Sequence, residues 1–135
     1  MRYLKLFEKY TSSEKMHNVK DICLDLIDEG FVVSHTRHAD DIINAGEMTV
    51  AGSTTVYLRR PIFSDFSEVK ETLERLCDYL GNDIRFISIL KENTSYWSQL
   101  YVRPRQRSGV SYPQPSVTNF SGYKFSAIRI NFMDK

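Results

Sequence analysis

Residues able to do chemistry gather most densely in one basic and aromatic stretch, residues 101–113. This stretch holds Tyr101, Arg103, Arg105, Arg107 and Tyr112. Arginine pairs bidentately with phosphate and stacks on flat rings, and tyrosine adds a ring face and a hydroxyl. Such groups in a loop are what a nucleotide or a single-stranded nucleic acid needs. The stretch therefore predicts an anionic-ligand site at these residues. The alternative is an ordinary solvated hairpin loop kept soluble by its arginines.

A second group of chemically active residue types surrounds His35 and His38, with Asp40 and Asp41 following. Side chains alternate along a strand, so the two histidines point to opposite faces unless the strand ends near Arg37. No second cluster completes a metal site, and we expect neither metal nor cofactor. Acid–base chemistry can proceed without a metal. One interpretation is therefore a small metal-independent nuclease using His35 or His38, and the other is a solvated histidine at a strand end.

The familiar catalytic motifs do not occur in the sequence. It contains no P-loop, no Gly-x-Ser-x-Gly elbow and no Cys-x-x-Cys pair, and we predict no catalytic residue. Cys23 and Cys77 both fall on apolar stripes of predicted helices. Two buried free thiols are favoured over a disulfide, because cysteine packs well as a small hydrophobe.

The sequence also indicates a compartment. Residues 1–9 are charged throughout and lack the apolar segment of a signal peptide. No run of about 18 apolar residues predicts a transmembrane helix. Together with the free thiols, these features predict an intracellular, cytoplasmic protein that does not bind a membrane.

Apolar periodicity predicts two long helices, over residues 12–29 and 65–80. Gly30 and Gly81 are placed to end them. Thr11 and Glu14 have capping-box spacing at the start of the first helix, and Asp65 or Ser67 can cap the second. Residues 2–9 predict a short additional helix. The predicted strands are 31–36, 49–59 with a bend at Gly52, 84–90, 96–103 and 123–132. Residues 38–47 and 104–119 are interpreted as loops, and Pro61 as the end of its strand.

This order of elements predicts an α+β fold in one domain, residues 1–135. The length of 135 residues allows a single compact core. Two main helices would cover one face of a mostly antiparallel sheet of about five strands, as a two-layer sandwich. The strand over 84–90 is apolar on both faces, which is typical of a central strand.

The net charge of +1 is the sum of two opposite parts. Residues 1–84 hold 10 basic and 15 acidic side chains, whereas residues 85–135 hold 8 basic and 2 acidic ones. The acidic groups follow the predicted outer faces of the helices. Arg59, Arg60 and Lys124 would join the basic stretch if their strand ends lie near it.

Three segments carry a resemblance to a known group of proteins: residues 1–8, 66–71 and 76–80. They resemble the corresponding parts of small uncharacterised accessory proteins of tailed bacteriophages. The resemblance implies a viral protein made in a bacterial cytoplasm that acts on a host or defence component. It brings no catalytic residue with it.

These observations together predict a non-enzymatic binding module. Its partner would be an anionic ligand, such as a nucleotide or nucleic acid, or a host protein, held by the basic aromatic stretch. The alternative is a protein–protein or self-assembling module, which would bury Leu4 and Phe7 or the two-sided strand 84–90 against another chain. The nuclease described above is a further alternative.

Overall fold

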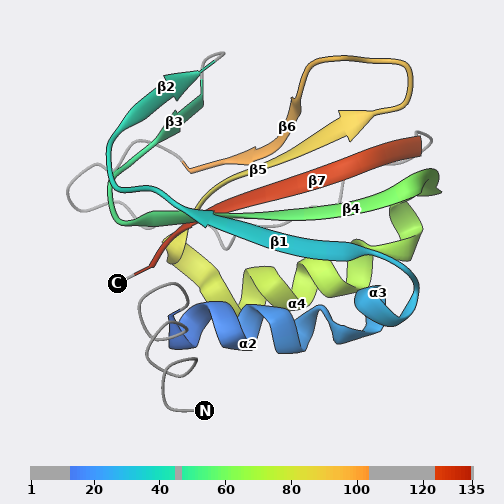
Figure 1. Ribbon diagram of the computed structural model, residues 1–135, viewed down its shortest axis with the longest axis horizontal. Coiled ribbons are helices and arrows are strands. Elements are labelled where there is room, and N and C mark those ends of the chain that lie inside the picture. The colour runs from blue at the N-terminus through green and yellow to red at the C-terminus, as the bar shows by residue number, and fades with distance from the viewer. Residues whose placement is uncertain (1–12, 45–46, 104–123, 135) are drawn as a thin grey trace, which may run out of the picture.

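A computed structural model describes residues 13–44, 47–103 and 124–134 of the chain. The predicted helix over 2–9, Thr11 and the whole of the predicted 104–119 loop lie outside these residues. Figure 1 shows two layers, with the helices on one side of a twisted sheet and a small ribbon rising on the other side. The predicted α+β sandwich is therefore confirmed.

The main sheet has five antiparallel strands in the order β1–β4–β7–β5–β6. These strands are β1 (Val32–Arg37), β4 (Ser53–Asp65), β5 (Ile84–Lys91), β6 (Ser98–Val102) and β7 (Lys124–Met133). The ribbon is a separate pair of strands, β2 (Ile42–Asn44) and β3 (Glu47–Thr49). The helices are α2 (Glu14–Ile22), α3 (Leu24–Asp28) and α4 (Lys70–Leu80), with 3-10 turns η1 (Phe66–Glu68) and η2 (Gly81–Asp83). Because β5 lies between β7 and β6, the predicted central position of this strand is confirmed.

The first predicted helix is two helices, α2 and α3. Ser13 caps α2, and its Oγ accepts a hydrogen bond from the Met16 N–H at 3.0 Å. The chain bends at Cys23, whose ψ of 2° interrupts the helix, so the prediction of one helix over 12–29 is wrong. Gly30 ends α3 at φ +97°, a conformation that glycine adopts without strain.

The second helical segment begins with a capping box at η1. Asp65 is the cap, and the Glu68 carboxylate accepts a hydrogen bond from the Asp65 N–H. The apolar stripe of α4 then buries Leu73, Leu76 and Leu80 completely or almost so. Gly81, at φ +53°, follows α4 as predicted.

Helices and sheet meet in one hydrophobic core. Alternate side chains of the three central strands point toward the helices. On this face, each side chain packs against its partner on the neighbouring strand. Val56 of β4 lies opposite Ile130 of β7, which lies opposite Ile87 of β5. All three residues are fully buried in the cluster that also takes the helix stripes.

Three predictions for residues 38–61 are wrong. Residues 38–47 contain β2 and part of β3 rather than only a loop, and Gly52 (φ +83°) separates β3 from β4 instead of bending one strand. Pro61 does not end its strand, because β4 runs on to Asp65 with a register shift between Arg59 and Ser64. The β1 pairing stops at Arg59, so the N–H that proline lacks costs no hydrogen bond on that side.

None of the helices within the described residues combines the length and the apolar character needed to cross a membrane.

Candidate functional site

The face of the sheet that points away from the helices, called the outer face here, carries aromatic and basic side chains. Strand alternation and register place Tyr57 and Arg59 of β4, Arg129 of β7 and Phe86 of β5 on it. Tyr57 lies directly opposite Arg129. Arg59 is exposed, whereas Tyr57 and Arg129 are half-buried. The five described strands of the main sheet contain a single acidic residue, Asp65, which pairs with Lys124 at the end of β4.

Arg129 organises the aromatic groups of this face. Its guanidinium carbon lies 4.4 Å from the Trp97 ring centroid and 5.7 Å from the Phe86 ring centroid. Both distances fall within the range of cation–π attraction. Arg59 lies in the same way over Tyr57, at 5.1 Å. The outer face is therefore built from two arginine–aromatic groups on neighbouring strands.

A hollow of about 460 Å³ opens next to Trp97 at one end of the outer face, and we call it the Trp97 hollow. Its walls include Arg59, Pro61, Leu90 and Trp97. Arg60 also lines it, but its guanidinium is bound to Ser64 and Glu68. A ring face and an exposed guanidinium thus border one concave surface.

Arg60 has a structural role in holding the helix start against the sheet. Its guanidinium binds Ser64 Oγ at 2.6 Å and the Glu68 carboxylate at 3.0 Å, and it lies 4.4 Å from the Phe31 ring centroid. The Arg60 hydrogen bond is the main reason that the pKa of Glu68 is lowered. Arg59 is therefore the better cation of the two for an external ligand.

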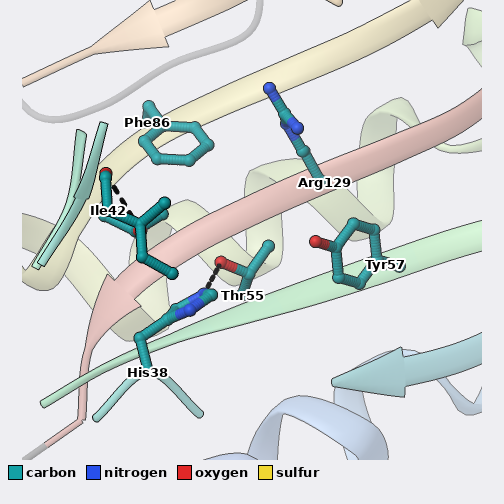
Figure 2. Close-up of a pocket in the computed structure, with 7 residues that line it drawn as sticks. His38, Ile42, Thr55, Tyr57, Phe86 and Arg129 are labelled. Atoms are coloured by element: carbon teal, nitrogen blue, oxygen red, sulfur yellow. Dashed lines mark hydrogen bonds between the residues drawn. The ribbon is translucent and has the colours of Figure 1, made fainter. Parts of the chain in front are cut away.

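A second, smaller cavity of about 200 Å³ lies where the β2–β3 ribbon approaches the outer face, and we call it the ribbon cavity. Tyr57, Thr55, Phe86 and Arg129 line it from the sheet. Ile42 and Thr49 line it from the ribbon, and His38 closes one end. Figure 2 shows these side chains arranged around a common space, with the Tyr57 hydroxyl pointing inward.

His38 is fixed by a short chain of hydrogen bonds. Its Nε2 lies 2.7 Å from Thr55 Oγ1, which also accepts a hydrogen bond from Asn131 Nδ2 at 2.9 Å. Burial lowers the pKa of His38, which favours the neutral ring. We assign the ring proton of neutral His38 to Nδ1. In this tautomer the Thr55 hydroxyl accepts a hydrogen bond from Asn131 and donates its own proton to His38 Nε2, so both hydrogen bonds have a donor and an acceptor.

The two histidines singled out in the sequence lie on opposite faces. His35 pairs with Val56 in register and shares its helix-facing side, whereas His38 lies past the end of β1 on the outer face. β1 ends at Arg37, the condition under which the two side chains could have converged, yet they lie on opposite faces of the sheet. Across the described ranges, no three His, Cys, Asp or Glu side chains come together as a metal-binding group.

The site residues predicted from the sequence fall into three groups. Tyr101 packs against the core from β6, and burial raises the pKa of its hydroxyl. Arg103 follows β6, and its N–H donates to the Arg85 carbonyl at 2.8 Å. Arg105, Arg107 and Tyr112 lie outside the described residues, so a site there stays a prediction.

The structure adds outer-face residues that sequence reasoning missed: Tyr57, Phe86, Trp97 and Arg129. One signal was present in the sequence. Arg129 stands between Ile128 and Ile130, so apolar and charged residues alternate there. This pattern is expected where a strand has one buried face and one less buried face.

Both cysteines are free and buried, as predicted. Burial raises the pKa of Cys23 to about 12 and that of Cys77 to about 11. Thiols held this far from ionisation are unreactive, so their contribution is to packing.

No family model, no curated protein and no solved structure matches this chain. The geometry of the outer face is therefore what indicates a function.

Proposed function

We propose that the protein is a non-enzymatic binding module that holds single-stranded nucleic acid on its outer face. The observation that carries the proposal is the Arg129 guanidinium lying against the rings of Trp97 and Phe86 on the helix-free side of the sheet. Exposed Arg59 stands beside this group at the edge of the Trp97 hollow. Single-stranded sites combine these two features, rings on which bases stack and cations that follow the phosphates.

The distribution of charge supports a polyanion on this face. The helix layer carries exposed or half-exposed carboxylates at Asp21, Asp25, Asp28, Glu71, Glu74 and Asp78, whereas the described strands carry only two acidic residues, Asp65 at the end of β4 and Glu47 in the ribbon. An approaching polyanion is repelled by the helix layer and attracted to the sheet. The charge division seen along the sequence is thus largely a division between the two layers.

The part of the basic aromatic stretch that follows Tyr101 belongs to the same proposal, whereas Tyr101 itself packs against the core on the helix-facing side of the sheet. Arg103 continues directly from β6, a strand of this sheet, and Arg105, Arg107 and Tyr112 follow it in the chain, so they would extend the site. As a cellular setting we propose the cytoplasm of a bacterium infected by a tailed phage. Two buried free thiols support a reducing compartment.

The chain has one tryptophan, Trp97, so its fluorescence reports directly on the proposed site. Titration with a single-stranded oligonucleotide is expected to quench it, because stacked bases contact the indole. Arg59→Ala should weaken binding by roughly 5-fold or more and reduce the dependence of log K on log salt by about 0.7, the loss of one phosphate contact.

Arg75→Ala is the matched control. It removes the same charge from α4, where Arg75 is 46% exposed and pairs with Asp25. Binding should be nearly unchanged in this variant. Absence of quenching by any single-stranded oligonucleotide, or equal losses in the two variants, would contradict the proposal.

A further inference from the structure

The ribbon cavity has the size of one flat ring. A closed apolar cavity of about 150 Å³ accommodates benzene, and this one measures about 200 Å³. Pockets for complete drug-sized ligands begin near roughly 300 Å³. The cavity therefore suits a single six-membered ring with small substituents, with the rest of the ligand outside.

The walls of the cavity combine apolar surfaces with a few hydrogen-bonding groups. Ile42 of the ribbon and the Phe86 ring supply apolar contact, as a stacked base requires. The Tyr57 hydroxyl points into the space and has no hydrogen-bond partner within the described part of the chain. His38 closes one end of the space, with its Nε2 held by Thr55 Oγ1.

A buried acceptor lies behind these groups. Asn131 is fully buried, and its register places it between Thr55 and Phe86, which both line the cavity. Its Nδ2 bonds Ser53, Thr54 and Thr55, whereas its Oδ1 finds no partner among the described residues. A buried acceptor without a donor costs free energy, and such atoms mark places where a ligand or water completes the structure.

We propose that the ribbon cavity holds one unstacked pyrimidine base of the strand bound on the outer face. This inference rests on the proposed function and adds a base preference to it. The size of the cavity admits one ring and leaves the second ring of a purine outside. The inward-pointing Tyr57 hydroxyl suits the O2 carbonyl that every pyrimidine base carries and that adenine lacks. Proteins that read single-stranded bases use this combination of stacking and edge hydrogen bonds.

The test compares oligothymidylate and oligodeoxyadenylate of equal length by fluorescence anisotropy of labelled oligonucleotides. The wild-type protein should bind oligothymidylate more tightly. Ile42→Phe fills the cavity from the ribbon, where Ile42 is 48% exposed, so the fold tolerates it. This variant should weaken oligothymidylate binding by about 5-fold or more, the loss of one stacked base, and leave oligodeoxyadenylate binding unchanged.

Tyr57→Phe removes only the hydroxyl and should weaken oligothymidylate binding by about 2- to 12-fold. Leu24→Phe on α3 and Tyr79→Phe on α4 are the matched controls, because both side chains are exposed on the helix layer. Neither should change the affinity for either oligonucleotide.

The outcomes separate the two proposals. Equal affinity for the two oligonucleotides, or no effect of Ile42→Phe, would overturn the base pocket and leave the strand-binding face intact. Failure of both oligonucleotides to bind would overturn both proposals. A loss of both affinities in Ile42→Phe, with an unchanged melting temperature, would show that the ribbon contacts the strand without selecting a base.

Discussion

The contact between Arg129 and Trp97 should stabilise the folded protein by a measurable amount, independently of any ligand. The guanidinium carbon lies 4.4 Å from the ring centroid, and Arg129 is half-buried. Cation–π pairs contribute about 0.5–1 kcal/mol when exposed and about 2 kcal/mol when desolvated. An intermediate position predicts a coupling free energy of about 1 kcal/mol.

The measurement is a double-mutant cycle of Arg129→Met and Trp97→Leu. Arg129 has further interactions besides those with the two rings, so each single substitution removes more than one contact, and only the cycle isolates the pair. Urea unfolding followed by far-ultraviolet circular dichroism gives the four free energies of unfolding. Fluorescence is unsuitable, because Trp97 is the only tryptophan.

A second cycle with Phe86→Leu provides the internal control. Phe86 lies 5.7 Å from the same guanidinium carbon, close to the limit of about 6 Å for this attraction, so its coupling should be the smaller one. A coupling at Trp97 indistinguishable from zero, or smaller than that at Phe86, would refute the view that Arg129 organises the outer face.

Three further predictions concern stability and reactivity. Burial lowers the pKa of His38 from 6.5, so protonation favours the unfolded chain, and stability present above about pH 6.5 is lost as the pH falls through the lowered value. The melting temperature should drop on acidification, and less so in His38→Gln. Gly30→Ala should cost about 1–2 kcal/mol in urea unfolding, because φ is +97°. The added Cβ makes only an ordinary 3.7 Å contact with Arg60, so a neutral result would show that the backbone relaxes. Cys23 and Cys77, with pKa values of about 12 and about 11, should resist iodoacetamide in the native protein and react after denaturation, as read by mass spectrometry. Rapid native labelling would contradict their burial.

The sequence predicts the fold well wherever an element is long enough to show its period. The stripe on α4 and the alternation in β7 extend over several turns or residue pairs, and both elements form as expected. β2 and β3 have three residues each, too few to reveal an alternation. The prediction that Pro61 ends its strand is wrong because a strand tolerates proline where no neighbouring strand needs its N–H, and strand order is a tertiary property.

The candidate site was harder to predict for the same reason. Tyr57, Phe86 and Arg129 come from three strands that are far apart in the chain, and the register of β7 against β4 and β5 brings them together. The residues of the basic stretch, in contrast, are neighbours in the sequence. Local density is visible in a sequence, whereas a site assembled across strands requires the strand order.

The position of β7 also determines how the protein can be made. This strand is the last one described in the chain, yet it lies at the centre of the sheet between β4 and β5. A ribosome must therefore synthesise past residue 133 before either neighbour has its partner. Before β7 is in place, the β1–β4 pair and the β5–β6 pair each have an unpaired edge, on β4 and on β5. Their apolar faces are also incompletely covered. Because β7 pairs with strands that precede it by many residues, closing the sheet requires contacts of high sequence separation, and such contacts form slowly.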